Sequence, residues 1–229
     1  MRAYTSLVGH LLGSHPEING YYEMHLSYAS PQDLERQARR YSEQDSLKPG
    51  SRFLFDKLLH NDDVLELEQL DPESTRVLIA LRPPEPTLKS IVSLFARKNS
   101  AHRYANPVGA ATYYVKRLQA LAAFGRQYPQ RYYYFDADLI RTDTARVLAA
   151  LGQWLPLGSP LAERYQSFAR TGVAGAGDTS PAITAGHVIR AQNAYPNIAL
   201  DAALLARAQQ AYQDCRKHLI DRAATALTA

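Results

Sequence analysis

Cysteine and long apolar runs are what this sequence most clearly lacks. Its 229 residues include one cysteine, Cys215, which excludes an intramolecular disulfide framework and any zinc site with two or more cysteine ligands. No run approaches the ~20 apolar residues that a membrane-spanning helix needs. The N-terminal segment also lacks a small-residue cleavage site, so it is a poor signal peptide. We therefore expect a cytoplasmic protein with no transmembrane segment and no bound metal.

The sequence also has little excess charge. It carries 26 lysines and arginines against 22 acidic residues, a formal net charge of +4. This balance is too weak to indicate a nucleic-acid partner, but it is compatible with a small anionic ligand. With 46% hydrophobic and 21% charged residues, the composition is that of a folded chain. The length predicts one domain over residues 1–229.

Apolar patterning predicts alternating strands and helices. Three short apolar stretches, each followed by a polar or proline-containing turn, are predicted to be buried strands: residues 51–55, 76–81 and 131–135. Helical spacing and start signals predict helices over residues 5–14, 31–46, 62–70, 86–98, 107–128 and 142–155. A last helix carries the apolar stripe Leu204, Ala208, Tyr212, Cys215 and Leu219. This alternation indicates an α/β protein, with a mostly parallel sheet flanked by helices.

Cationic side chains follow two of the predicted strands. Lys57 comes after the strand at 51–55, Arg82 follows the strand at 76–81, and Arg2 precedes the first helix. Ligands of parallel α/β sheets bind at the carboxyl ends of the strands, where helix starts add N–H donors. The three cations together predict a pocket for a multiply phosphorylated ligand. Taken singly, each is more typical of a solvated surface residue.

Two common nucleotide-binding motifs are absent. The G-x-x-x-x-G-K-[ST] loop of nucleotide kinases does not occur, because Gly9 and Gly13 are followed by His10 and Ser14. A G-x-G-x-x-G motif after a predicted strand does not occur either. Both absences weigh against a kinase-like phosphotransferase.

The order and spacing of several short motifs resemble those of sulfotransferases that use 3′-phosphoadenosine 5′-phosphosulfate (PAPS). The family's R-S-G-T/S-T/S-L loop and L-x-x-H-P-x-I segment are similar to residues 2–7 and 12–18. Its D-K-x-x-x-N segment resembles residues 56–61, and an arginine with a serine eight residues later corresponds to Arg82 and Ser90. The likeness spans most of the chain, and the four motifs occur in the family's order.

The resemblance implies a P-loop-NTPase-like fold and a set of donor-binding residues. Thr5 and Ser6, with the helix start that follows, would hold the 5′-phosphate of PAPS, and Arg82 and Ser90 would bind its 3′-phosphate. The glycine-rich stretch over residues 170–186 resembles a loop that closes over the 3′-phosphate and adenosine. Its expected donor contacts are Arg170 and Gly172.

The resemblance also implies catalytic residues. Lys57 and Arg2 would stabilise the leaving nucleotide phosphate, and PAP (3′,5′-diphosphoadenosine) would be the product. Glu23 falls where related proteins place the general base that removes the acceptor's proton. His60, three residues after Lys57, and His25 are rival bases. The acceptor is expected to be a small molecule, glycan, lipid or tyrosyl group, and an oligomer is possible.

Two departures from the family pattern leave a second interpretation open. Tyr4 occupies the position of the family's loop glycine, where a bulky side chain would reshape the 5′-phosphate site. The family's first strand would precede Arg2, so we expect that strand to be missing or truncated. The alternative function is a catalytically degenerate sulfotransferase-fold module that binds a nucleotide or a protein.

Overall fold

The computed structural model describes residues 2–191 and 195–229, which form two compact units. The first unit contains residues 2–3, 77–137, 191 and 195–229, and the second contains residues 4–76 and 138–190. Each unit is therefore assembled from segments that lie far apart in the sequence. That both belong to one domain stays a prediction.

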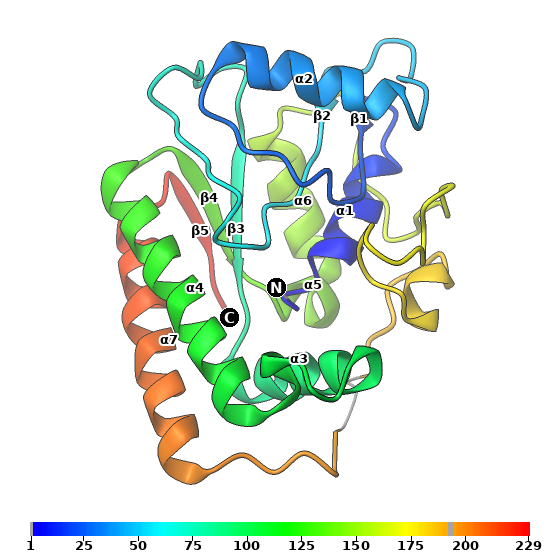
Figure 1. The fold of residues 1–229 in the computed structure, drawn as a ribbon. Helices are drawn as coiled ribbons and strands as arrows, with labels where there is room; N and C mark the ends of the chain where they lie inside the picture. The colour runs from blue at the N-terminus through cyan, green and yellow to red at the C-terminus, as the bar shows by residue number, and fades with distance from the viewer. Residues whose placement is uncertain (1, 192–194) are drawn as a thin grey trace. The chain divides into compact units, whose positions relative to one another are not determined.

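The first unit is built on a three-stranded parallel sheet in the order β3 (Val77–Leu81), β4 (Tyr132–Asp136) and β5 (Thr225–Leu227). Parallel neighbours require crossover connections, which here are helical. The connection from β3 to β4 contains α3 (Pro84–Lys98), the short 3-10 helix η1 (Arg103–Ala105) and α4 (Pro107–Gln127). The connection from β4 back to β5 includes α7 (Ala202–Arg222), which packs beside α4 (Figure 1).

Apolar side chains from these helices and strands form one continuous core. The α7 stripe predicted from the sequence is fully buried in it, and small residues allow α7 to approach α4 closely. At Gly125 of α4, an added Cβ would lie 2.8 Å from the Leu219 side chain. The buried residues of this core include Leu88, Ile91, Tyr113, Tyr114, Leu118, Tyr132, Tyr134, Tyr212 and Leu219.

An ion pair at the carboxyl end of β4 fastens α7 to the sheet. The Asp136 carboxylate accepts from Nε and Nη2 of Arg216 at 2.8 and 2.6 Å, from the Tyr134 hydroxyl at 2.7 Å and from the Ala229 N–H at 2.9 Å. Burial alone would raise the pKa of Asp136, but these hydrogen bonds hold it below its ordinary value. The carboxylate is therefore ionised and fully partnered at neutral pH.

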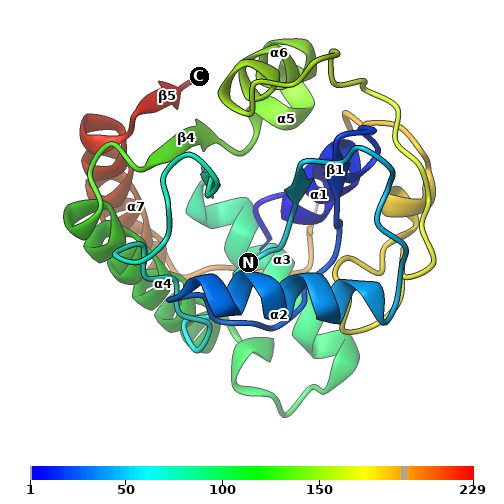
Figure 2. The ribbon, with the colours of Figure 1, turned by 90° about the horizontal axis from the view of Figure 1, so that it is seen from above.

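The second unit contains α1 (Thr5–Gly13), α2 (Pro31–Ser42), α5 (Leu139–Thr142), α6 (Thr144–Trp154), the 3-10 helix η2 (Pro181–Thr184) and a short parallel pair. The pair joins β1 (Ile18–Asn19) to β2 (Phe53–Leu54), and α1 lies beside β1 (Figure 2). Gly9 and Gly13 permit this packing. A Cβ on Gly13 would lie 2.4 Å from the Gly20 carbonyl oxygen, and one on Gly9 would lie 2.7 Å from that of Tyr21.

The prediction of an α/β protein with parallel strands is confirmed, with one change of arrangement. The described strands form two small parallel sheets and not one. The predicted strand at 51–55 is reduced to the two residues of β2, and β1 and β5 were not predicted. Both are too short to show an alternating pattern of their own. No helix in the described part of the chain is long and apolar enough to cross a membrane.

Most predicted helices are confirmed, but the one at 62–70 is wrong. The Tyr28 N–H donates to the Val64 carbonyl and the Glu66 N–H donates to the Tyr28 carbonyl, both at 2.8 Å, so Leu65 forms a parallel bridge to Tyr28 within an irregular segment. Pairing with a residue almost 40 positions earlier overrides the local helical pattern. The predicted helix at 142–155 begins earlier than expected, and non-helical dihedrals at Asp143 divide it into α5 and α6.

We expect the Arg216→Met substitution to lower the free energy of unfolding by about 2 kcal/mol at neutral pH, because it leaves the Asp136 carboxylate buried without its cation. The low pKa of Asp136 means that this contribution is present at neutral pH and is lost as the pH falls below about 4. Urea unfolding of the wild type and the variant, at neutral pH and below about pH 4, measures this difference in the free energy of unfolding.

Lys217→Met is the matched control, because its pair with Asp221 is exposed to solvent and should contribute far less to stability than the Asp136–Arg216 pair. Equal losses in the two variants at neutral pH would contradict the role given to Arg216.

Candidate functional site

A buried lysine is the centre of the candidate site in the second unit. Lys57 is 4% exposed, and its Nζ donates to Ser6 Oγ at 3.2 Å. Ser6 lies in the first turn of α1, and its hydroxyl oxygen also accepts from the Asp178 N–H at 3.0 Å. Burial lowers the pKa of Lys57, while Glu23, Asp56 and Asp178 oppose that shift. We call Ser6, Lys57, Gly177 and Asp178 the Lys57 cluster.

Gly177 brings the glycine-rich loop into direct contact with this lysine. Its φ of 144° belongs to the region that favours glycine, and an added Cβ would lie 2.7 Å from Lys57 Nζ and 3.0 Å from Ser6 Oγ. The glycine-rich stretch was expected to close over an anionic ligand, but the residues selected within it were Arg170 and Gly172. Gly177 and Asp178 were missed, because the stretch holds several glycines and nothing local distinguishes them.

Arg170 and Gly172 have other surroundings. The Arg170 guanidinium lies 4.9 Å from the centre of the Tyr22 ring, and the Arg170 N–H donates to the Tyr21 hydroxyl at 3.0 Å. Gly172 has a φ of 77°, and an added Cβ there would make an ordinary contact with Thr184. The two residues thus shape the loop, and their predicted contact with a donor nucleotide stays a prediction.

The chain enters α1 through a residue in the left-handed conformation. Tyr4 has φ 57° and ψ 19°, which is the conformation a glycine adopts most readily. Its hydroxyl accepts from Arg141 Nη1 at 2.9 Å, and the guanidinium lies 5.1 Å from the ring centre. The loop before Thr5 and Ser6 therefore keeps a glycine-like backbone although it carries a bulky side chain, which is directed to α5.

Glu23 contacts the same glycine-rich loop that contacts Lys57. Its N–H donates to the Ala176 carbonyl at 3.3 Å, and its carboxylate lies 3.7 Å from His25 Nε2. His25 Nε2 is also 3.1 Å from the Gly175 carbonyl oxygen, and the His25 backbone is left-handed with φ 54°. The structure thus places one rival base, His25, beside Glu23. His60 lies in the irregular segment after Lys57, and its role as a rival stays open.

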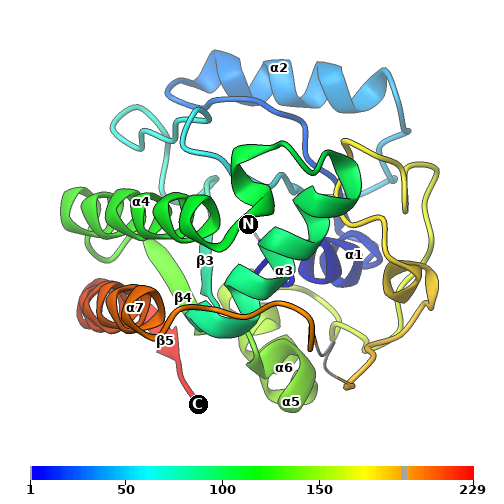
Figure 3. The same cartoon turned by 60° about the horizontal axis from the view of Figure 1, so that its bottom comes forward.

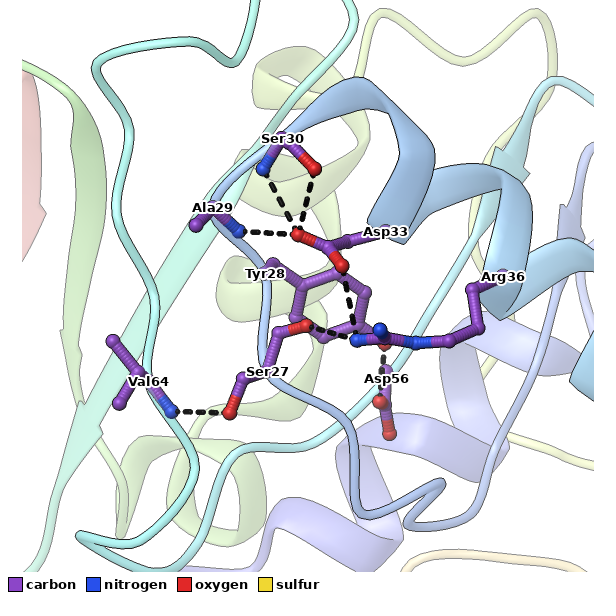
Figure 4. A network of polar contacts seen from close by, with 8 residues as sticks. All are labelled: Ser27, Tyr28, Ala29, Ser30, Asp33, Arg36, Asp56 and Val64. Carbon is purple, nitrogen blue, oxygen red and sulfur yellow. Dashed lines mark hydrogen bonds and ion pairs between the residues drawn. The ribbon is translucent and has the colours of Figure 1, made fainter.

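Asp56 connects the Glu23 segment to Lys57. Its Oδ1 accepts from the Met24 N–H at 2.9 Å and the Lys57 N–H at 2.6 Å. Its Oδ2 accepts from the Tyr28 hydroxyl at 2.5 Å, the bond that Figure 4 shows. Burial raises the pKa of Asp56, whereas these three hydrogen bonds and the charge of Lys57 lower it. All three donors point at the carboxylate, an arrangement that suits the ionised form.

Asp33 offers a comparison within the same network. Its carboxylate accepts from the N–H groups of Ala29 and Ser30 at 2.9 and 3.0 Å and pairs with Arg36, so it caps the start of α2 (Figure 4). Asp33 therefore anchors the same stretch of backbone without contacting Glu23 or Lys57 in any described hydrogen bond or ion pair.

A second group of predicted residues meets in the first unit. Arg2 Nε donates to Ser90 Oγ at 2.8 Å, and Arg82 Nη1 donates to the Arg2 carbonyl at 3.3 Å. The Tyr195 hydroxyl donates to Ser90 Oγ at 3.2 Å. Arg82 and Ser90 are buried, and Arg2 has a left-handed backbone with φ 61°. We call Arg2, Arg82, Ser90 and Tyr195 the Arg82 cluster.

Fold position explains how the Arg82 cluster forms. Arg82 directly follows β3, and Ser90 lies in the middle of α3, the helix that begins two residues later. The Tyr114 hydroxyl donates to the Arg82 carbonyl at 2.7 Å, which fixes the backbone at the strand end. Two guanidinium groups with two hydroxyls suit a phosphate group, because arginine presents a planar fork of donors.

In comparisons with known proteins, no family model, no curated protein and no solved structure matches this chain. The interpretation of the Lys57 and Arg82 clusters therefore rests on their own geometry and chemistry.

We expect Asp56→Asn to lower the pKa of Lys57 further, because the variant removes a negative charge beside a buried ammonium. The amide keeps the size of the carboxylate, so the chain should fold with a stability loss of about 1–3 kcal/mol. The titration of the Lys57 amine, followed by nitrogen-15 NMR, measures the pKa.

Asp33→Asn is the control, because Asp33 anchors the same backbone stretch but is not among the groups that shift the pKa of Lys57. If both variants left that pKa unchanged, the electrostatic link between Asp56 and Lys57 would be refuted.

Proposed function

We propose that this chain is a sulfotransferase that moves a sulfuryl group from PAPS to a hydroxyl of an acceptor. We base this on one observation: a buried lysine, the first turn of α1 and a glycine of a loop converge in the Lys57 cluster, with Glu23 tied to the same place through Asp56. A buried cation at a helix start suits a phosphoryl or sulfuryl group. The parallel strands and the motif order support a P-loop-NTPase-like sulfotransferase fold.

In this proposal the Lys57 cluster binds the phosphosulfate end of the donor. Ser6 and the start of α1 hold the 5′-phosphate together with Thr5, and the Lys57 ammonium faces the oxygen that bridges phosphorus and sulfur. As that sulfur–oxygen bond breaks, negative charge grows on the nucleotide phosphate, and the cation stabilises it. The burial that lowers the pKa of Lys57 also strengthens its attraction for that charge.

In this proposal the hydroxyl oxygen of the acceptor forms the new bond to sulfur. Its hydroxyl oxygen attacks the sulfur in line with the leaving phosphate and passes its proton to the Glu23 carboxylate, so the products are a sulfate ester, PAP and a proton. His25, 3.7 Å from that carboxylate, is placed to contact the acceptor or to share the proton.

The Arg82 cluster is assigned to the 3′-phosphate of the donor. Arg82 and Ser90 keep the role that the resemblance gave them. The Arg2 guanidinium donates to Ser90, so we assign Arg2 to the same phosphate and leave charge stabilisation of the leaving group to Lys57. The alternative, a degenerate binding module, would use these residues to bind the nucleotide without turnover.

We expect PAP at about 100 times its dissociation constant to raise the melting temperature by roughly 5–10 °C, since binding to the native state stabilises it by about 2.7 kcal/mol. ATP, which lacks the 3′-phosphate, should have little effect. Arg82→Ala should weaken PAP binding at least tenfold, whereas Lys89→Ala, which removes a partly buried cation of α3 paired with Glu85, should not. A melting temperature indifferent to PAP would refute the proposed function.

Glu23→Gln should leave PAP binding intact and reduce turnover by about 10²–10⁴-fold, because the amide cannot take the acceptor's proton. Transfer of labelled sulfate from PAPS across a panel of hydroxyl compounds measures this, with His25→Ala and His60→Ala tested in parallel. Retained turnover in Glu23→Gln would show that another residue is the base. PAP binding with no transfer to any acceptor would favour the binding module.

A further inference from the structure

Positive charge is distributed very unevenly along this chain. Between Pro86 and Phe135 there is no aspartate or glutamate, although the segment contains eight lysines and arginines. The rest of the chain holds all 22 acidic residues and is net negative. The whole excess of positive charge therefore comes from α3, η1 and α4, which pack together in the first unit (Figure 3).

Three of these cations gather where α3 ends and η1 begins. Arg97 and Lys98 close α3, and Arg103 opens η1; all three are exposed. Within residues 2–191 and 195–229, none of the three forms an ion pair with a carboxylate. Several exposed cations elsewhere are paired, as in Arg36–Asp33, Arg39–Glu35, Arg52–Glu17, Arg190–Glu163 and Lys217–Asp221.

Aromatic side chains hold this part of the surface in shape. The Arg103 guanidinium lies 4.7 Å from the centre of the Tyr104 ring and donates to its hydroxyl at 2.7 Å. Phe95 stacks on His102 with ring centres 4.3 Å apart, and Tyr104 meets Phe95 edge-on. A guanidinium held in this way loses little conformational freedom on binding an anion, so the entropic cost of ordering it is small.

The same corner carries an exposed apolar side chain. Val108 is 64% exposed, the highest value among the large hydrophobic residues that the structure describes. It adjoins Gly109, whose backbone packs so closely on Arg103 that an added Cβ would lie 1.7 Å from the Arg103 carbonyl oxygen. Val108 therefore adjoins a residue that packs on the Arg103 backbone, and we call Arg97, Lys98, Arg103 and Val108 the basic corner.

The negative end of the α3 dipole explains only part of this arrangement. It stabilises cations in the last turn of a helix, which accounts for Arg97 and Lys98. It accounts neither for Arg103, which lies beyond the helix, nor for the exposure of Val108. Cations without carboxylates repel one another, and this repulsion is relieved when an anionic partner is bound.

We propose that the basic corner docks this protein on an anionic lipid bilayer. The three cations would contact headgroup phosphates, and Val108 would enter the boundary between headgroups and acyl chains. A lipid surface is favoured over a dissolved polyanion because it alone uses both the cations and the apolar side chain. This inference stands apart from the proposed sulfotransfer, since it needs neither PAPS nor an acceptor.

Sedimentation of the full chain with lipid vesicles tests the proposal. The wild type should bind phosphatidylcholine vesicles that contain phosphatidylglycerol, should not bind phosphatidylcholine alone, and should be released by salt. The triple variant Arg97→Ser, Lys98→Ser, Arg103→Ser should bind at least tenfold more weakly, because each cation near an anionic surface strengthens binding about fivefold. Equal binding to both kinds of vesicle would overturn the proposal.

A control variant separates the corner from net charge. Arg39→Ser, Arg40→Ser, Arg207→Ser removes three exposed cations elsewhere on the chain and should bind vesicles like the wild type. If the control lost as much binding as the corner variant, net charge and not the corner would be responsible. Circular dichroism of both variants confirms that any loss does not come from unfolding.

Val108→Ser distinguishes a bilayer from other anions. It should weaken vesicle binding several-fold while leaving any binding to single-stranded RNA or heparin unchanged. Wild-type binding to RNA or heparin that depends on the corner, with no vesicle binding, would assign the corner to a dissolved polyanion and overturn the proposal. Release from vesicles by millimolar inorganic phosphate, at constant ionic strength, would point to a free-phosphate site and also overturn it.

Discussion

The Lys57 ammonium, held almost entirely out of water, is the constraint on which the candidate site depends. A buried charge is costly unless polar groups and opposite charges surround it. Here the compensation comes from Ser6 on α1, Asp178 in the glycine-rich loop and the Glu23 segment, three stretches far apart in the sequence. The groups that compensate for the burial of the Lys57 amine therefore bring three parts of the second unit together. A site that must stabilise a developing phosphate charge needs the same arrangement.

Backbone strain is concentrated within or beside the residues of each candidate cluster. Among the described residues, the non-glycine residues with positive φ are Arg2, Tyr4, His25 and Gln130. Left-handed backbone costs most side chains about 1 kcal/mol or more, and it persists where the surroundings impose it. Arg2 belongs to the Arg82 cluster, Tyr4 leads into Ser6, and His25 adjoins Glu23. At Tyr4 the restraint is visible, because the Arg141 guanidinium stacks on the ring and donates to its hydroxyl.

The first unit uses arginine in different ways. In the Asp136–Arg216 pair the guanidinium is fully matched to a carboxylate, which fastens α7 to β4 and leaves little capacity for a ligand. In the Arg82 cluster the Arg2 guanidinium donates to the Ser90 hydroxyl, and the Arg82 guanidinium donates to the Arg2 carbonyl. In the basic corner, no carboxylate of the described residues forms an ion pair with Arg97, Lys98 or Arg103. Arg216 thus stabilises the fold, whereas we propose that the exposed cations of the basic corner bind anions.

The sequence by itself determined the α/β class, most helices, the α7 stripe and the candidate cations, because these features follow from local periodicity, capping residues and strand-end position. Tertiary structure decided which of them meet. Arg2 and Ser90, 88 residues apart, share a hydrogen bond, and Asp56 bonds to the segment after Glu23. Only the folded loop identifies Gly177, and not Gly172, as the glycine that contacts Lys57. Packing over long sequence distances makes these choices, and no local pattern encodes them.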